Sequence, residues 1–445
     1  MSRCLIQLSR SGKVSETSKF IANQFVRIVL IGSYQHQADD TEQLALRVIA
    51  DVSGQARRSV FEPSGELGML NTDAQPSAPT IGPDWLIGVD VRQRKAILPQ
   101  IDGLRGIAIG AVIFQHAFSH GLSFALVATG VVAFPYLLDN GWLGVSLFFI
   151  LSGFVLSLPY TGVESKFNDP AEAIAFYRRR ARRLLPLFAF GCFVGYLVNH
   201  TTLRSLLLAL TTLSMFSTDE FFPRVNGPFW TLMLEIWFSI LLPVLIIAAA
   251  RFGYWRVFVA AAATALMLRL VATQLSFADP HINPLKDSVP ARIDDFVVGM
   301  VVAKLYRDGH LREGLQWLLV PGAALVALSG IGWDLIMQGI APRWVGGLLN
   351  LVTSTGFACV VISCLTQQSG TGRAISWRPL RVFGAMCFSL YCWHFLVVQV
   401  SNPNSLEIRR VALFLFTTAA ISLLSYKFIE FPQRTWRSLL TVEHR

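Results

Sequence analysis

Ten long apolar runs, separated by short polar loops, constrain this chain more than any other feature of its sequence. They occupy residues 101–121, 141–160, 184–200, 229–250, 255–275, 292–306, 315–335, 345–366, 382–401 and 409–429. Because a helix of about 20 apolar residues spans the hydrocarbon core of a bilayer, most of these runs have the length of a transmembrane helix. Only 15% of the 445 residues are charged and 53% are hydrophobic, which argues against an ordinary soluble enzyme. The sequence therefore predicts an all-α fold, a polytopic membrane helix bundle of about ten transmembrane helices.

The first part of the chain differs from the rest. Residues 1–96 are polar and mixed in charge, with Gly, Ser and Pro scattered through them, and they hold no apolar run long enough to cross a bilayer. We expect a cytosolic, disordered extension without a cleaved signal peptide, then a membrane domain at 97–437 and a short cytosolic tail at 438–445. The six cysteines are not spaced as metal-binding pairs, so we expect neither a metal site nor a disulfide framework.

The distribution of basic residues predicts the orientation. The net charge of +10 is spread over short loops between the apolar runs, which favours membrane topology over nucleic-acid binding. With ten spans and a cytosolic amino terminus, twenty of the Lys and Arg residues between Arg92 and Arg437 fall on the inner side. Seven fall on the outer side, namely Arg204, Arg224, Lys286, Arg292, Arg343, Arg409 and Arg410. This asymmetry predicts a multi-pass protein of the cell (inner) membrane with both termini in the cytosol.

Two further apolar segments are assigned to the membrane interface. Residues 122–138 contain Gly130 and Pro135, and residues 203–216 are short for a span. A full crossing by 203–216 would invert all later loops against the charge bias. We therefore expect both segments to be interfacial or re-entrant.

Two ionisable side chains lie inside the first apolar run. Arg105 and His116 are eleven residues apart in DGLRGIAIGAVIFQH, so on a helix they project from one face, about 16 Å apart along the axis. Taken singly, the arginine could snorkel to a headgroup and the histidine could be a packing residue. The topology also places His116, Glu235 and His394 in one layer, about 18–22 Å from the cytosolic side. Two histidines and a carboxylate at one depth indicate a buried polar site.

Six segments of the chain follow one another in a recognisable order. They are LPQIDGLRGIAIGAVIFQHA, GWLGVSLFFILSGFVLS (141–157), the basic loop FYRRRARRLLP, PFWTLMLEIWFSILLP (228–243), FGAMCFSLYCWHFLVV (383–398) and YKFIEFP (426–432). In this order they resemble the motifs of the acyltransferase-3 family of integral membrane O-acyltransferases. The resemblance covers about residues 97–437, and it implies transfer of an acyl group to a hydroxyl.

The sequence departs from the pattern of that family at four positions. Ser146 stands where an acidic residue is common, Thr231 replaces a serine, Ile236 replaces a second glutamate and Phe388 replaces a tyrosine. These departures bear on positioning and on the choice of acceptor. The functional residues of the motifs are retained at Arg105, His116, Glu235, His394 and Glu430.

The chemistry of acyl transfer points to a histidine. A base must take the proton of the acceptor hydroxyl and an acid must assist the leaving thiol, and histidine serves as both near neutral pH. We therefore predict His116 as the catalytic base, oriented or polarised by Glu235 or His394. A covalent histidyl or seryl intermediate, with Ser152 or Ser146 as the serine, is an open alternative.

The predicted substrates are a cytosolic donor and a glycan acceptor. The donor is acetyl-CoA or another acyl-CoA, a substrate rather than a permanent cofactor, and its phosphates suit arginine. The acceptor is a carbohydrate or glycolipid hydroxyl, and membrane lipid and proteins of polysaccharide synthesis are the further expected partners. Many relatives carry an esterase-like domain after the last span, and this sequence shows none, so we expect the membrane domain to act alone or with a partner. The residues predicted to bind substrates are Arg105, Arg179, Arg180, Arg183, Trp230, Tyr391 and Glu430.

Each of these binding residues has a simpler alternative. A run of arginines beside a span is also a topology signal and a contact for lipid headgroups. Trp230 is also typical of an interface or of helix packing, and Glu430 of a pair with a neighbouring cation. Asp294 and Asp295 are expected at an outer helix end, either paired locally or exposed to the acceptor.

Two other functions fit the same pattern. A transporter or flippase is the main alternative, because a buried layer of His and Glu can also relay protons or coordinate solutes. The sequence shows no repeated pattern of broken helices that favours it. An inactive acyltransferase-like sensor or scaffold is the third hypothesis.

Overall fold

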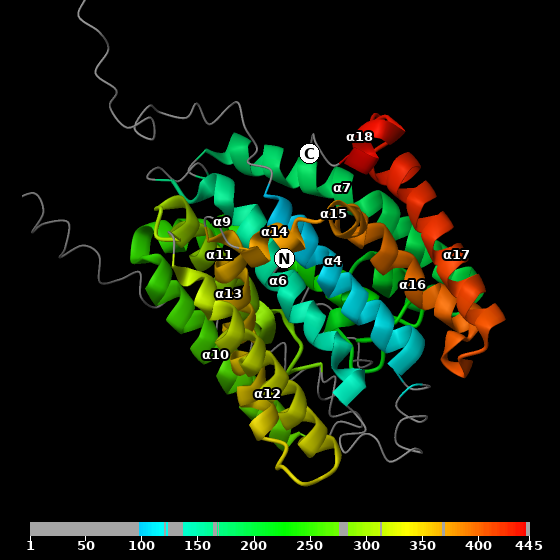
Figure 1. Ribbon diagram of the computed structural model, residues 1–445, viewed down its shortest axis with the longest axis horizontal. Coiled ribbons are helices and arrows are strands. Elements are labelled where there is room, and N and C mark those ends of the chain that lie inside the picture. Colours follow the sequence, from blue (N-terminus) through cyan, green and yellow to red (C-terminus); the bar gives the residue numbers. More distant parts are fainter. Residues whose placement is uncertain are drawn as a thin grey trace, which may run out of the picture. The chain divides into compact units, whose positions relative to one another are not determined.

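The computed structural model describes residues 98–119, 122, 137–162, 167, 169–275, 284–311, 314–366 and 370–441. The chain divides into two units, Met1–Arg94 and Lys95–Arg445, and the described residues all belong to the second. The predicted extension at 1–96 lies outside the described residues and stays a prediction. All regular secondary structure in the described ranges is helical (Figure 1), which confirms the all-α class.

Seven helical segments of the described chain are long and apolar enough to cross a membrane. They are Asp139–Tyr160, which contains α6 (Gly144–Ser157); α7 (Pro170–Val198); α9 (Phe229–Phe252); α10 (Tyr254–Gln274); Leu315–Met337, which contains α12 (Leu319–Met337); α13 (Val345–Leu365); and Ile408–Glu430, which contains α17 (Ile408–Ser425). The other α-helices are α4 (Pro99–Phe114), α8 (Leu203–Leu210), α11 (Val289–Arg307), α14 (Gly370–Ile375), α15 (Arg378–Ala385), α16 (Cys387–Ser401) and α18 (Trp436–Thr441). Of these, α15 and α16 together make an eighth apolar candidate, bent by 72°.

The ten predicted spans all coincide with helical structure. Eight of them correspond to the seven segments and the bent pair α15–α16. The remaining two are α4, which has 16 residues and contains Asp102 and Arg105, and α11, which contains Arg292, Asp294 and Asp295. These two helices are less apolar because they carry charged side chains. Among the described residues, seven helices, or eight with the bent pair, are therefore long and apolar enough to cross a membrane. The polytopic helical bundle is confirmed, and the number of ten spans stays a prediction.

The arginine-rich segment 178–183 lies inside a helix and not in a loop. Helix α7 begins at Pro170, and the Asp169 carboxylate accepts a hydrogen bond from the Ala171 N–H at 2.8 Å, as an N-cap does. The helix then continues for 29 residues to Val198. The predicted basic loop is therefore wrong at this point, because the cap starts the helix well before the arginines. Consecutive arginines on a helix project from different faces, so they meet different partners.

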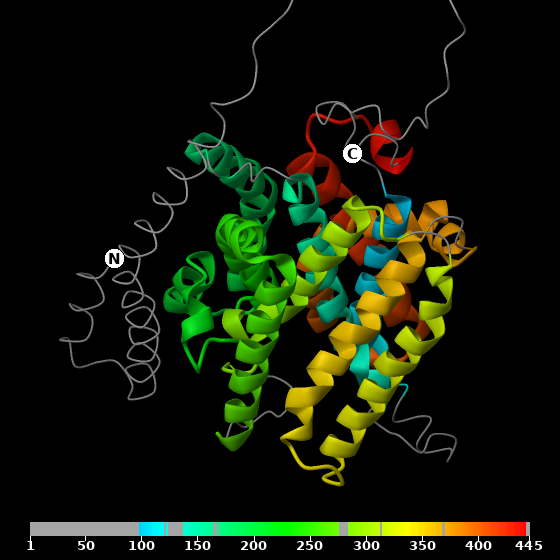
Figure 2. The ribbon, with the colours of Figure 1, turned by 90° about the vertical axis from the view of Figure 1, so that its left-hand side faces the viewer.

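Close backbone contacts fix α11 inside the bundle. A Cβ on Gly153 of α6 would lie 2.0 Å from the Phe296 carbonyl oxygen, and one on Gly299 of α11 would lie 2.0 Å from the Ile150 carbonyl oxygen. These glycines let the two backbones touch, as small residues do between membrane helices. Helices α12 and α13 pack along each other on one flank of the bundle (Figure 2).

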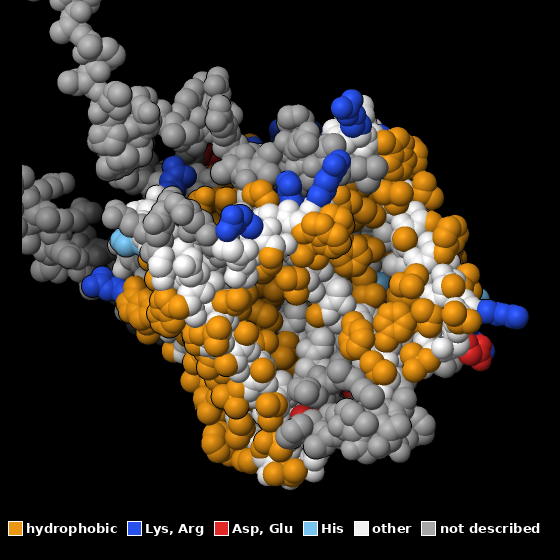
Figure 3. All heavy atoms as spheres, viewed as in Figure 1, with side chains coloured by type: hydrophobic (Ala, Val, Ile, Leu, Met, Phe, Trp, Pro, Cys, Tyr) orange, Lys and Arg blue, Asp and Glu red, His pale blue; other side chains and the backbone are white. Residues whose placement is uncertain are grey.

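The outer surface of the bundle is apolar. Large hydrophobic side chains are exposed on several helices, among them Val320 at 74% and Phe416 at 76%. Hydrophobic side chains are spread over much of the described surface seen in Figure 3, and most of its Lys and Arg side chains lie toward the end where α7 and α18 are found. A surface of this kind suits a bilayer, with one end of the bundle in contact with anionic headgroups.

Candidate active site

His116 lies where α4 changes its helical geometry. The α-helix ends at Phe114, and residues Gln115–Ser119 continue as a single π-helical turn. Such turns are frequent at functional sites because they redirect a side chain without ending the helix. The turn is held by the Asn404 side-chain amide, which donates to the His116 carbonyl oxygen at 3.1 Å.

His394 meets His116 from helix α16. His394 Nε2 lies 3.3 Å from His116 Nδ1, and the ring centroids are 5.2 Å apart. His394 is completely buried. The ring of Phe395 stands edge-on to His116 at a centroid distance of 5.2 Å. The two histidines that were predicted to share one depth are thus in direct contact.

Backbone carbonyls determine the tautomers of the pair. His394 Nδ1 lies 2.9 Å from the Tyr391 carbonyl oxygen and 3.1 Å from that of Leu390. A carbonyl oxygen only accepts, so His394 carries its proton on Nδ1 and presents a lone pair at Nε2. His116 Nδ1 lies 3.0 Å from the Val112 carbonyl oxygen, so it also carries a proton, which it shares between Val112 and His394. The basic lone pair of neutral His116 is therefore on its Nε2 atom.

Tyr391 supports His394 through a closed set of hydrogen bonds. Its hydroxyl donates to the Pro228 carbonyl oxygen at 3.1 Å and accepts from the Thr231 hydroxyl at 2.6 Å. Its ring stands edge-on to His394 at 5.4 Å. Thr231, which replaces the usual serine, still supplies the hydroxyl. The substrate-binding role predicted for Tyr391 stays a prediction; in this structure its side chain is buried and packs beside His394.

Glu235 lies beside an arginine. Its carboxylate oxygen Oε1 accepts from Arg180 Nη2 at 2.7 Å, and Arg180 Nε donates to the Ser239 hydroxyl at 3.2 Å. Ser239 donates in turn to the Glu235 carbonyl oxygen at 2.8 Å. Of the two residues predicted to orient His116, His394 contacts its imidazole at 3.3 Å, and the Glu235 carboxylate pairs with Arg180. The shared depth did not show which partner each side chain faces.

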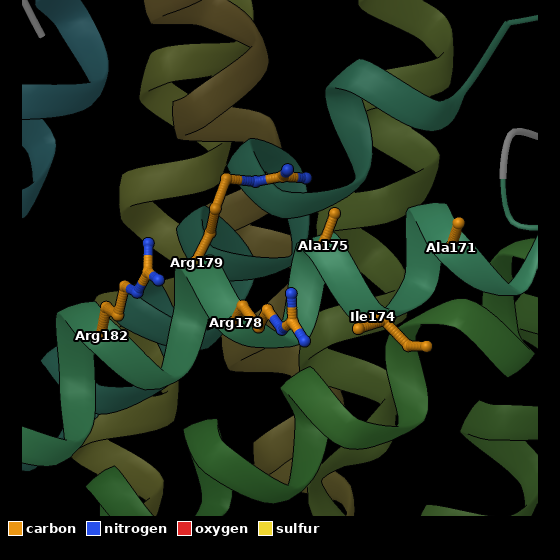
Figure 4. A pocket seen from close by; sticks show the side chains of 6 residues that line it. All are labelled: Ala171, Ile174, Ala175, Arg178, Arg179 and Arg182. Atoms are coloured by element: carbon orange, nitrogen blue, oxygen red, sulfur yellow. The ribbon is translucent and has the colours of Figure 1, made fainter.

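The other arginines of α7 project in several directions. Arg179 donates to the Tyr160 hydroxyl at 3.1 Å, and the guanidinium of Arg183 lies 5.8 Å from the centroid of the Phe431 ring. Arg178, Arg179 and Arg182 line an open hollow of about 520 Å³ on the surface of the helix (Figure 4). Of the predicted substrate-binding arginines in this segment, Arg180 alone reaches Glu235.

The remaining predicted site residues, Arg105, Trp230 and Glu430, contact neighbours other than the histidine pair. Arg105 is near the start of α4, 4.0 Å from Asp102 and eleven residues from His116, so about 16 Å of helix separates the cation from the pair. Trp230 is buried against Phe221, with ring centroids 5.8 Å apart. Glu430, at the end of the last span, accepts a hydrogen bond from the Ser389 hydroxyl.

A buried ionic network is the feature that the sequence reasoning missed. Arg269 of α10 forms a bidentate pair with Asp294 of α11 at 2.6 and 2.7 Å, and both side chains are fully buried. Arg292 binds Asp287 at 3.0 Å, Asn350 at 2.9 Å and Asp295 at 3.3 Å. Of the two alternatives for Asp294 and Asp295, the structure agrees with local pairing, because Asp295 contacts Arg292 of its own helix, and it contradicts exposure to the acceptor, because both side chains are buried.

A lysine lies in the short segment before α11. The Lys286 ammonium is 4.7 Å from the centroid of the Trp333 ring and 5.7 Å from that of Trp142. Burial lowers the pKa of Lys286, and the charge of Asp287, 3.4 Å away, opposes that shift. Aromatic faces and a carboxylate thus replace the water that the ammonium loses.

Comparison with known proteins bears on the same segments. A family model described as an acyltransferase domain matches residues 98–428. YrhL of Bacillus subtilis (strain 168), whose name assigns it provisionally to the peptidoglycan O-acetyltransferases, is 26% identical over 377 residues, which cover 77% of this chain and 56% of YrhL. The O-acetyltransferase OatA of Staphylococcus aureus (strain NCTC 8325 / PS 47) is 21% identical over 365 residues, which cover 76% of this chain and 57% of OatA. The peptidoglycan O-acetyltransferase OatA of Listeria monocytogenes is 22% identical over 372 residues, covering 77% and 57%.

The aligned region covers only part of the length of these relatives. It spans little more than half the length of each of the three proteins. No solved structure matches the chain.

Proposed function

This chain belongs to the acyltransferase-3 family, and from that premise we propose that it is a membrane O-acetyltransferase. It moves an acetyl group from acetyl-CoA to a hydroxyl of a cell-envelope glycan. The observation that carries the proposal is the contact of 3.3 Å between His116 Nδ1 and His394 Nε2, with His394 Nδ1 held by two carbonyl oxygens. These contacts fix the tautomer of neutral His116 with its basic nitrogen at Nε2, as a general base requires.

In the proposed step, His116 Nε2 takes the proton of the acceptor hydroxyl as its oxygen attacks the thioester carbonyl carbon. The new C–O bond forms, the C–S bond breaks, and the proton on His116 passes to the departing thiolate, so that the products are the acetyl ester and free coenzyme A. While His116 is protonated, its Nδ1–H donates to His394 Nε2. A hydrogen bond from a charged donor is stronger than that from a neutral one, so the pair favours the protonated intermediate.

The cationic side chains on the proposed donor side fit a phosphate-bearing substrate. Arg180 lies next to Glu235, and Arg105 is on the same helix as His116, about 16 Å away along the axis. Guanidinium groups bind phosphates with two parallel hydrogen bonds. In this proposal, Arg105 and Arg180 bind the phosphates of coenzyme A, and Glu235 keeps Arg180 in position.

The choice of glycan rests on the relatives. Two of the three compared proteins are named as peptidoglycan O-acetyltransferases, so peptidoglycan-type glycans are the first acceptors to test. Acetyl is proposed as the acyl group on the same ground.

The test is acetyl transfer by the full chain in detergent or nanodiscs, with labelled acetyl-CoA and a glycan acceptor. His116→Ala should lower kcat by about 10²- to 10⁴-fold, the usual worth of a general base, and should leave donor binding intact. His116→Gln should not restore turnover, since an amide does not accept a proton at neutral pH. The matched control is His310→Gln, which alters an exposed loop histidine. Substantial transfer by His116→Gln at normal expression would refute the general-base role.

Substitutions of Arg105 distinguish a role in donor binding from a role in the chemical step. Arg105→Ala should raise the KM for acetyl-CoA with little change in kcat, and Arg105→Lys should restore it only in part, because lysine lacks the planar fork. A fall in kcat at saturating donor, with KM unchanged, would instead place Arg105 in the chemical step.

A further inference from the structure

A short segment between α8 and α9 is anchored beside the histidine pair. The side-chain amide of Asn226 is completely buried and donates to the Cys392 carbonyl oxygen at 3.0 Å, two residues before His394. The next residue, Gly227, faces the ring of Phe395, which stands edge-on to His116. Pro228 accepts the hydrogen bond of Tyr391. The residues 226–228 thus contact α16 on both sides of His394.

Two exposed arginines lie at the edge of this segment. Arg224 precedes Asn226 by two residues, so their Cα atoms are at most about 7 Å apart. Arg224 Nε is 3.5 Å and Arg204 Nη1 is 3.6 Å from the same oxygen, Oε1 of Glu220. The two guanidinium groups therefore lie close together. The Glu220 side chain is 3% exposed, whereas those of Arg204 and Arg224 are 65% and 62% exposed.

The guanidinium N–H groups of Arg204 and Arg224 are mostly available to a ligand. Glu220 Oε1 already accepts a hydrogen bond from the Ser205 hydroxyl at 2.8 Å. In the part of the chain that the structure describes, neither guanidinium donates a side-chain hydrogen bond, although each has five N–H groups. Arg204, Arg224 and Glu220 together leave one net positive charge at the exposed edge of the segment whose residues 226–228 contact α16 beside His394.

We propose that Arg204 and Arg224 bind an anionic group of the acceptor, so that the preferred acceptor is a glycan that carries carboxylates near the acetylated hydroxyl. This inference rests on the proposed function and names its substrate class. A carboxylate accepts two parallel hydrogen bonds from a guanidinium, and the pair of arginines provides two such forks side by side. The buried Glu220 holds both side chains at the edge without neutralising them. In the ten-span prediction these residues lie on the outer side of the membrane, where a cell-envelope glycan is found.

The experiment compares two acceptors that differ only in charge. One is a β-1,4-linked amino-sugar oligosaccharide with lactyl carboxylates on alternate sugars, and the other is the same oligosaccharide with each carboxylate converted to an amide. The full chain in nanodiscs should show a KM about tenfold lower for the carboxylate form, as expected for hydrogen bonds to a charged group. The double variant Arg204→Gln/Arg224→Gln should remove this preference and leave kcat and the KM for acetyl-CoA unchanged. Arg224→Lys should retain part of it.

The matched control is Arg343→Gln, which removes an exposed arginine on the same predicted side of the membrane and should keep the full preference. Equal KM values for the two acceptors in the unaltered protein would overturn this inference and leave the proposed function standing. The same holds if the double variant keeps the preference, or if it lowers kcat equally for both acceptors, which is the sign of a structural ion pair. Failure to acetylate either glycan would refute the proposed function as well.

Discussion

Removal of His394 tests how the histidine pair works. His394→Ala deletes the acceptor that lies 3.3 Å from His116 Nδ1 and leaves the Val112 carbonyl oxygen as the remaining partner. A hydrogen bond to a charged group is worth about 1.5–3 kcal/mol, and this bond strengthens only while His116 carries the transferred proton. The loss therefore falls on the transition state, and kcat should decrease by about 10- to 150-fold with both KM values unchanged.

The decisive measurement is a double-mutant cycle with His116. If His394 acts only through His116, the variant His116→Ala/His394→Ala should be no slower than His116→Ala alone. His394→Gln, which offers an amide oxygen as acceptor, should recover part of the rate. The control on the same helix is Gln399→Ala, an exposed position near the end of α16.

Two outcomes would contradict this account. If the two substitutions multiply, then His394 has a chemical role of its own, such as a second proton carrier. If His394→Ala raises the KM for the acceptor and spares kcat, then His394 binds substrate and does not position the base. The assay is initial-rate acetyl transfer at saturating and limiting concentrations of each substrate, with expression and melting temperature measured for every variant.

Three further predictions concern the bundle itself. Asp294→Asn should lower the free energy of unfolding in detergent by about 3–5 kcal/mol, because it leaves Arg269 buried without its counter-charge. The double variant Arg269→Met/Asp294→Leu, which replaces the ion pair with two apolar side chains, should recover most of this loss. A decrease below about 1 kcal/mol for Asp294→Asn, the contribution of a solvent-exposed ion pair, would contradict the buried pair. Gly299→Ala should cost at least about 2 kcal/mol, since its Cβ would meet a backbone oxygen at 2.0 Å, whereas Gly110→Ala, whose Cβ has its nearest neighbour at 3.9 Å, should be neutral in the same melting experiment. A reporter fused after Arg437 should be active only in the cytosol, and extracytoplasmic activity would refute the ten-span topology.

The contact between the histidines was within reach of the sequence. Helix rise and the charge bias of the loops place His116 and His394 at the same depth, and both belong to segments that resemble one family's motifs. Depth is a one-dimensional quantity, however, and it says nothing about the direction in which a side chain points. Glu235 shows this, because its carboxylate pairs with Arg180 at 2.7 Å. The cap formed by Asp169 before Pro170 was the available signal that the arginines belong to a helix and can reach α9.

The buried network had a sequence signal of its own. Arg269 lies in the middle of an apolar run, and an arginine at such a position requires a partner. Helix α11 is the next α-helix along the chain after α10, and Asp294 lies in its first two turns, so a pair between opposite charges on these consecutive helices was a natural expectation. The pairing of Asp294 with Arg269 was missed because the aspartates were expected either to pair locally beside Arg292 or to face the acceptor.

The network also explains why Ser146 is compatible with the fold. At position 146, where the acyltransferase-3 family commonly has an acidic residue, this chain has a serine, whose hydroxyl accepts a hydrogen bond from Arg292 Nη1 at 3.3 Å. A buried guanidinium without a counter-charge would be costly. Here Asp287 and Asp295, at 3.0 and 3.3 Å from Arg292, balance the charges of Arg292 and of Lys286, which lies 3.4 Å from Asp287, while Arg269 pairs with Asp294. Introducing a further carboxylate by Ser146→Asp would therefore add an uncompensated negative charge beside Arg292, so the serine is matched to the aspartates that surround it.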